Sequence, residues 1–487
     1  MSIGVGSFII IMLYLILLLF VAIHSYRSQK IKNVEGFFLA NRGVSSVLLP
    51  LTMIAAMQST FAFLGAPGMY YLHGISFIVI VLSQSWVALM VIYFGSKICT
   101  LGKKYGYMTI GDFFEDRFQS PYLKVLSAII SVLMTAVFLA MQYVGSARAI
   151  SVVSRSSVSY LTALLVIAAF SLLYVVVGGA KSVVLTDAVQ AVILIGGVII
   201  AASIAIIPAG GIPALFKKVA QIDPKLLSRP GVKGLYNDKY WMMQFIVLPF
   251  GIWLCPHVWV RSLMAKDKKA LAASALSIPI SQIVIYATAT VFIGLSGHVL
   301  LGNVDSPDNV LPLLMNKYTN WVVAALIIAA SIAAGVSTIN SMILSCSQIL
   351  SQDIILRTKK AKMSEKENLS ISRIVTIGIV IFGVVIAIKP PQSLVTVVID
   401  IAYTGLAQLA PAFIMGLYWK KCTKHGAMAG MTAGITILFA TKLMKVTPLG
   451  FPGFLWAFFI NIILTVIVSL MTEAEPKERL QRFFKEA

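Results

Sequence analysis

The sequence predicts an all-α polytopic membrane protein, because long apolar segments recur along nearly the whole chain and few charged residues interrupt them. Of the 487 residues, 59% are hydrophobic and 12% are charged, and the mean hydropathy is +0.91. A soluble domain carries about 25% charged residues, whereas a helix needs roughly 20 apolar residues to cross a membrane. Soluble globular folds, secreted disulfide scaffolds and disordered proteins are therefore excluded.

Thirteen transmembrane helices are predicted in a single domain over residues 1–472, followed by a short cytoplasmic tail over 473–487. Their centres lie near residues 14, 58, 86, 136, 168, 195, 251, 287, 336, 379, 404, 434 and 460. The first apolar segment has a basic flank after it and none before it. This pattern is typical of a retained helix rather than of a cleaved signal peptide.

The basic loops predict the orientation of these helices. With thirteen crossings, most Lys and Arg residues fall on the side of the C-terminal tail, among them Arg27, Lys30, Lys32, Arg42, Lys103, Lys104, Lys266, Lys268, Lys269, Lys359, Lys360, Lys362, Lys420 and Lys421. Short loops rich in Lys and Arg remain in the cytoplasm. We therefore expect a cell-membrane protein with its N-terminus outside and its C-terminus in the cytoplasm.

Two of the predicted helices contain Gly and Pro interruptions, in segments 55–68 and 248–257. Proline removes a backbone donor and clashes with the preceding turn, so each helix should kink or unwind there. The two breaks lie five helices apart. This spacing predicts an inverted repeat, over about 45–208 and 240–418, with a binding site between the broken helices. Simple bending of packed helices is the alternative.

Hydroxyl groups cluster on the ninth predicted helix, in the segment Ala-Gly-Val-Ser-Thr-Ile-Asn-Ser over residues 334–341. A small hard cation such as Na⁺ prefers oxygen ligands, and two hydroxyls with the free carbonyls of an unwound neighbouring helix would supply about five. Ser and Thr are also common at helix contacts in membranes, so packing without a cation is the alternative.

Several motifs resemble those of the sodium:solute symporter family, and together they extend over about residues 36–434. The motifs are GGAKSVVLTDAVQ at 178–190, YTGLAQLAP at 403–411, YWKK at 418–421 and GAMAG at 426–430. Pro256-His257 with Arg261, and the segment 337–341, resemble the branch of pantothenate, proline and monocarboxylate carriers. QYVGSAR at 142–148 and QIDPKLL at 221–227 are most similar to the pantothenate type.

The resemblance implies the inverted-repeat fold named for a bacterial leucine transporter: a 5+5 core with one extra N-terminal and two extra C-terminal helices. It implies a secondary active transporter, not an enzyme, that couples Na⁺ to the uptake of a small organic acid, pantothenate-like or a monocarboxylate. A proton-coupled symporter, and a membrane sensor or channel that does not transport, are the alternatives. No H-E-x-x-H, G-x-S-x-G or G-x-x-x-x-G-K-[ST] motif supports an enzyme or an ATP-driven pump.

Site residues are also implied by the resemblance, position by position. The sodium ligands would be the carbonyls of three residues and the hydroxyls of two: Ala55, Gln58 and Ala334, then Ser337 and Thr338. Some members hold a second sodium nearer the cytoplasm. Here its ligands would be Asp187, Ser341 and Asn340, the last an amide where a hydroxyl is expected.

The solute site is expected to differ from that of proline carriers. Met57 stands where those carriers have a carboxylate, and Leu248 and Ile252 stand where they have aromatic residues. The side chains expected to face the solute are Ser59, Gln142, Trp253 and Gln408.

Three further charged residues stand out within or beside apolar segments. Asp400 is either functional, as intramembrane carboxylates usually are, or paired with a backbone end or a lysine. Arg148 and Arg261 fall near predicted helix ends. We therefore expect their side chains to extend toward the membrane surface.

Overall fold

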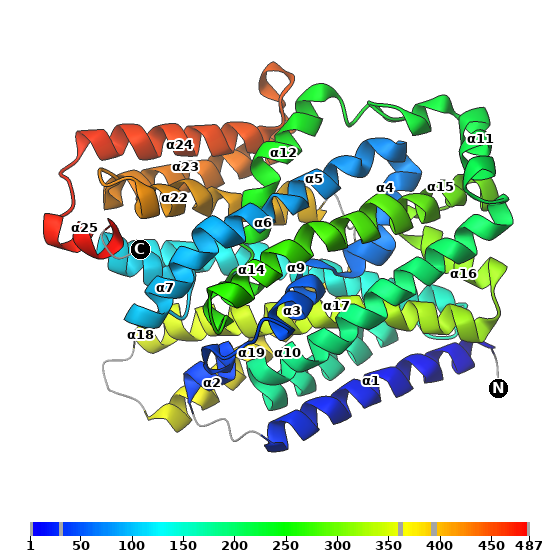
Figure 1. The fold of residues 1–487 in the computed structure, drawn as a ribbon, viewed down its shortest axis with the longest axis horizontal. Coiled ribbons are helices and arrows are strands. Elements are labelled where there is room, and N and C mark those ends of the chain that lie inside the picture. Colours follow the sequence, from blue (N-terminus) through cyan, green and yellow to red (C-terminus); the bar gives the residue numbers. More distant parts are fainter. Residues whose placement is uncertain (1–2, 29–32, 359–363, 391–396, 485–487) are drawn as a thin grey trace.

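The computed structural model describes residues 3–28, 33–358, 364–390 and 397–484, and its regular structure is helical (Figure 1). Within these ranges, the only strand-type pairing is an isolated parallel bridge between Val44 and Ala265. Several basic residues used above for orientation lie outside the described residues: Lys30, Lys32, Lys359, Lys360 and Lys362. The all-α polytopic class is confirmed.

The helices of the first half of the chain are α1 (Ile3–Ser28), α2 (Val34–Leu39), α3 (Leu48–Met57), α4 (Ala66–His73), α5 (Val79–Ser85), α6 (Val87–Met90), α7 (Ser96–Tyr105), α8 (Ile110–Phe118), α9 (Pro121–Val153), α10 (Tyr160–Ala209), α11 (Ile212–Ile222), α12 (Asp238–Trp253) and α13 (Pro256–Met264). Those of the second half are α14 (Lys268–Gln282), α15 (Thr290–Leu300), α16 (Val310–Tyr318), α17 (Trp321–Ile349), α18 (Leu356–Thr358), α19 (Glu365–Ala387), α21 (Thr404–Leu406), α22 (Ala410–Tyr418), α23 (Lys424–Leu443), α24 (Gly453–Met471) and α25 (Lys477–Phe484). Wider π-type turns extend several of them, at Phe61–Gly65, Val91–Gly95, Ile283–Ala289, Leu350–Ile355 and Val398–Tyr403.

In the part of the chain that is described, ten helical segments are long and apolar enough to cross a membrane, and the bent pair α12–α13 makes an eleventh. The sequence predicted thirteen. The difference arises at the breaks. Helix α3 is a short helix of its own, and the rest of that predicted crossing forms one long helical segment, Phe61–Tyr105, with the predicted crossing that follows. A further apolar helix, Tyr160–Val176, is also short.

Helix α17 lies at the centre of the bundle, where it packs against α9, α10, α3 and α13 (Figure 1). Every residue from 327 to 349 is buried. Helix α1 lies along α10 and α17 at the lower edge of the view, while α23 and α24 pack together at the upper left. The polar residues of α17 are therefore enclosed by protein and do not face lipid.

The two chain ends lie at opposite ends of the bundle. The start of α1 is at the right in Figure 1, whereas α25 is at the left, where it contacts α8 and α22. Helix α7 carries Lys103 and Lys104 in its last turn. Figure 1 places α7 on the same side of the bundle as α25.

The first broken helix unwinds before its proline. Helix α3 ends at Met57, and Gln58 has an extended backbone with φ −96° and ψ 125°. Pro67 lies at the start of α4, where the π-type turn Phe61–Gly65 runs into this helix without a gap. In the second broken helix, α12 ends at Trp253 and Pro256 begins α13, with a bend of 56° between the two helices.

Two glycines permit close backbone geometry beside these breaks. Helix α10 bends at Gly179, whose φ of +59° favours a residue without a side chain. A Cβ on Gly251 in α12 would lie 1.8 Å from the carbonyl oxygen of Tyr403. Only glycine therefore allows α12 to approach this turn so closely.

Candidate functional site

The break after α3 places backbone oxygens next to the hydroxyls of α17. The Ser337 hydroxyl donates to the carbonyl oxygens of Ala334, at 2.8 Å, and of Ala55, at 3.0 Å. The Thr338 hydroxyl lies 3.1 Å from the backbone carbonyl oxygens of Gln58 and Ala334 and 3.4 Å from that of Ala55. The structure thus brings together all five residues that the sequence suggested for sodium.

This cluster fits a small monovalent cation chemically. Three carbonyl oxygens and two hydroxyl oxygens converge, and all five residues are fully buried. A hydroxyl proton can rotate away from a carbonyl, so both oxygen types can present lone pairs to an ion. A hard cation takes oxygen ligands, and a neutral set leaves one net positive charge when Na⁺ binds.

Ser59 and Gln142 stabilise the unwound turn. The Gln142 side-chain oxygen accepts hydrogen bonds from the Thr60 backbone N–H, at 3.0 Å, and from the Thr60 hydroxyl, at 2.7 Å. The Ser59 hydroxyl accepts one from the Phe61 N–H, at 3.2 Å. Both side chains therefore meet at the break, where they cap the backbone that follows it.

Replacing Gln142 with methionine is expected to leave the Thr60 N–H and hydroxyl without their acceptor. A buried donor left unpaired costs about 1–3 kcal/mol, so the midpoint of thermal unfolding should fall. The sodium concentration for half-maximal uptake should rise, because the backbone at the break is less well ordered. Gln348→Met is the matched control, since Gln348 is another buried glutamine and donates to Met108 instead. Equal sodium dependence in the two variants would contradict this role for Gln142.

Trp253 and Gln408 have other packing and hydrogen-bond partners. The Trp253 ring packs between Phe94 and Phe413, with ring centroids at 5.4 and 5.3 Å. The Gln408 amide donates to the Thr404 carbonyl at 3.1 Å, and its oxygen accepts from Asn461 of α24 at 3.2 Å. The contact of these two residues with solute, like that of Ser59 and Gln142, stays a prediction.

Three buried glutamines have side-chain polar atoms without partners, and sequence reasoning missed two of them, Gln84 and Gln244. Both side-chain polar atoms of Gln58 and of Gln244 lack hydrogen bonds, as does the oxygen of Gln84. Gln84 and Gln244 lie on α5 and α12, which pack together. Buried polar atoms are nearly always satisfied, so these amides are available to water or solute. A glutamine within an apolar helix was the signal that would have identified them.

A row of contacting aromatic rings lies between the first break and a pocket at the start of α12. Phe61 contacts Phe77, which contacts Tyr236, which contacts Tyr240, with centroid distances of 6.3, 6.1 and 5.6 Å. Tyr240 lines a pocket of about 620 Å³ together with Asp400. These rings separate the pocket from the break.

Asp400 in this pocket forms the lysine pair that the sequence left as an alternative. Its carboxylate lies 2.9 Å from the Lys442 ammonium, and the Tyr240 hydroxyl donates to it at 3.3 Å. Lys442 is the more exposed partner, with 47% of its side chain accessible. Such a pair contributes little to stability.

Arg261 does not extend to the surface of the bundle, so that expectation is corrected for this residue. The Arg261 guanidinium lies 2.8 Å from the Asp187 carboxylate, and both residues are at most 2% exposed. Arg148, whose side chain is 18% exposed, lies 3.2 Å from the buried Asp308, and its position relative to the membrane surface stays a prediction. Arg261 follows the second break, so the end of its helix lies inside the bundle instead of at its surface.

Arg261 also engages the residues suggested for a second sodium. Its guanidinium donates to Asp187 and, at 3.0 Å, to the Ser341 hydroxyl. A sodium ion about 4 Å from this guanidinium would be repelled by about 4 kcal/mol at an effective dielectric constant of 20. Asn340 keeps an unpaired side-chain oxygen. As arranged here, the three residues do not fit a second sodium ion.

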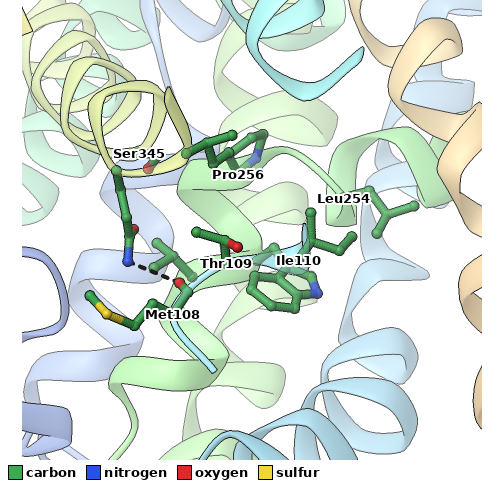
Figure 2. A pocket seen from close by; sticks show the side chains of 10 residues that line it. Met108, Thr109, Ile110, Leu254, Pro256 and Ser345 are labelled. Atoms are coloured by element: carbon green, nitrogen blue, oxygen red, sulfur yellow. Dashed lines mark hydrogen bonds between the residues drawn. The ribbon is translucent and has the colours of Figure 1, made fainter. Parts of the chain in front are cut away.

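The second break is covered by the loop before α8. Figure 2 shows Met108, Thr109 and Ile110 facing Leu254 and Pro256 across a cavity of about 10 Å³, with Ser345 of α17 beside it. The Gln348 amide donates to the Met108 carbonyl at 2.9 Å, drawn as a dashed line. A cavity of this size holds about one water molecule.

Ion pairs hold this loop and α8 against the ends of α9 and α17. The Lys124 ammonium lies 2.7 Å from Asp112, 2.9 Å from Glu115 and 3.7 Å from Asp353. The Thr109 hydroxyl donates to Asp353 at 2.8 Å. The second break is thus closed on the side of α8 in this structure.

Comparisons with known proteins agree with this geometry. The family model described as "Sodium:solute symporter family" matches residues 37–434. The sodium/pantothenate symporter of Haemophilus influenzae is 29% identical over 444 residues, which are 89% of each chain, and that of Escherichia coli is 25% identical over 90% of this chain and 91% of the relative. The Escherichia coli sodium/proline symporter is 25% identical, covering 100% of this chain and 97% of its own.

Solved structures show the fold. A Na⁺-coupled sialic acid symporter in a substrate-bound outward-open state matches with a TM-score of 0.80 at 18% identity, covering 98% of this chain and 99% of its own. A nucleobase-cation-symport-1 family transporter matches with a TM-score of 0.61 at 12% identity, covering 93% and 98%. The fold is thus the leucine-transporter type that the resemblance implied. With the family model matching most of its length, the chain belongs to the sodium:solute symporter family, as a multi-pass sodium-coupled transporter and not an enzyme.

Proposed function

We propose that this symporter uses the inward sodium gradient to carry a small organic acid, pantothenate-like or a monocarboxylate, into the cell. The observation that carries the proposal is the meeting of five buried oxygens at the break between α3 and α4. The sodium ligands would be Ala55, Gln58, Ala334, Ser337 and Thr338. We further propose thirteen crossings of the cell membrane, with the N-terminus outside and the C-terminus in the cytoplasm.

The lining around the break supports an acid with an apolar body. Met57, Leu248 and Ile252 supply apolar surface on the sides where proline carriers are polar or aromatic, and all three are buried. The unpaired amides of Gln58 and Gln84 supply hydrogen bonds. A carboxylate would be stabilised by the positive helix ends at the breaks and by the nearby cation.

The same lining disfavours sugars. A sugar buries many hydroxyl groups, and each one left unpaired costs about 1–3 kcal/mol. The relatives support an acid too, because two of them are named sodium/pantothenate symporters, while the proline symporters make proline the competitor to exclude.

Competition in proteoliposomes is expected to separate these solutes. With labelled pantothenate as the probe and an inward sodium gradient, unlabelled pantothenate or short monocarboxylates should lower uptake, while glucose should not. Proline should compete more weakly than the carboxylates with apolar bodies. Protein-free liposomes give the background. Uptake that proline or glucose inhibits, and no carboxylate affects, would contradict the proposed solute class.

A further inference from the structure

We infer that the Arg261 guanidinium takes the place of a second coupling cation, so that this chain binds one Na⁺ per cycle. The inference rests on the proposed function, because it assumes that the five-oxygen cluster is the sodium site. It concerns a second position, nearer the cytoplasm, where Arg261 of α13 meets Asp187 of α10.

The guanidinium is built into this position by contacts with several helices. It donates to the Asp187 carboxylate at 2.8 Å and to the Ser341 hydroxyl of α17 at 3.0 Å. It also donates to the Thr52 carbonyl of α3 at 3.0 Å and to the His257 carbonyl of its own helix. The Thr52 hydroxyl in turn donates to Asp187 at 2.6 Å. One fixed cation therefore joins both broken helices to α10 and α17.

The charge at this position is already balanced. Asp187 carries one negative charge and Arg261 one positive charge, and both are fully enclosed. Arginine does not lose its proton in proteins, so the positive charge cannot leave to admit a metal ion. A sodium ion added here would leave two buried cations sharing one carboxylate, which burial in a low dielectric opposes.

Removing the guanidinium is expected to create a second sodium site at this position. The Arg261→Ala variant frees the Ser341 hydroxyl and one carboxylate oxygen of Asp187, while the other Asp187 oxygen and the Asn340 amide oxygen already lack partners. These oxygens carry one net negative charge, a donor set that suits Na⁺. The variant should therefore bind one more sodium ion than the natural chain.

Counting bound sodium on the purified full chain tests this without knowledge of the solute. With radioactive Na⁺ alone as the probe, the natural chain should bind one ion, and Thr338→Ala should bind it roughly tenfold or more weakly. Arg261→Ala should bind two, and Arg261→Lys, which keeps the positive charge, should stay at one. Thermal unfolding reports whether each variant is folded.

The outcomes test the inference about Arg261 separately from the proposed sodium site. Two ions on the natural chain, with one lost in Asp187→Asn, would overturn the inference. A folded Arg261→Ala variant with no additional ion would overturn it as well. If that variant does not fold, the natural chain and Thr338→Ala decide, because an ion that Thr338→Ala binds as tightly as the natural chain does requires a second site. No ion on the natural chain, with one gained in Arg261→Ala, would contradict the sodium-site proposal and the count of one ion, while the exclusion of a cation by the guanidinium would stand.

Discussion

The Asp187→Asn variant is expected to lose about 3–5 kcal/mol of stability, because it leaves the Arg261 charge buried without its partner. Asp187 is 1% exposed and Arg261 2%, so solvent cannot take over from the lost carboxylate. The midpoint of thermal unfolding in detergent should fall well below that of the natural chain. Sodium-driven uptake should fall with it, because the guanidinium joins both broken helices.

Two comparisons separate this effect from mere loss of a carboxylate. Asp400→Asn removes a partly exposed ion pair with Lys442, and such a pair is worth about 0–1 kcal/mol. Removing both charges in Asp187→Asn/Arg261→Met should recover much of the lost stability, because no unpaired charge remains. An Asp187→Asn variant that unfolds at the temperature of the natural chain would show that the pair is not buried as described.

Ser337→Ala and Thr338→Ala are expected to raise the sodium concentration for half-maximal uptake roughly tenfold or more each. Every variant removes one oxygen from the five-oxygen cluster, and an interaction with a charged partner is worth about 1.5–3 kcal/mol, where 1.4 kcal/mol is tenfold. The amount of protein in the membrane should not change. Sodium-dependent uptake over a range of sodium concentrations measures the effect.

Ser345→Ala is the matched control for these two variants. Ser345 lies on the same helix and is also buried, but its hydroxyl donates to the Ser341 carbonyl at 2.7 Å, away from the break. Its sodium dependence should equal that of the natural chain. If Ser337→Ala and Thr338→Ala behave like this control, the cation site has been assigned to the wrong oxygens.

The sequence, with its family resemblance, was sufficient for the fold class and for naming five residues that meet at the first break. Interruptions at 55–68 and 248–257 are local signals, since an apolar helix with Gly and Pro must bend or unwind. The hydroxyls within residues 334–341 likewise lie on one helix and are visible in the sequence. The number of crossings was less accessible, because the turn after Gln58 is capped by Gln142, which lies 82 positions after its partner Thr60.

Arg261 and the solute residues could not be placed from the sequence for a different reason. A basic residue near the end of an apolar segment normally reaches the membrane surface, but the break before α13 places this end in the interior. Asp187 lies 74 positions earlier, and only the folded chain brings it within 2.8 Å. The hydrogen bonds between Gln408 and Asn461 of α24 likewise arise only in the folded chain.

Accumulation of labelled pantothenate in proteoliposomes under an imposed sodium gradient tests the central claim most directly. One Na⁺ moving inward down about 100 mV releases roughly 2.3 kcal/mol, enough for more than tenfold accumulation. We expect saturable accumulation that requires an inward sodium gradient, that disappears when the gradient is collapsed, and that an equal proton gradient does not replace. Equal uptake with and without sodium, or uptake driven by protons alone, would contradict the account.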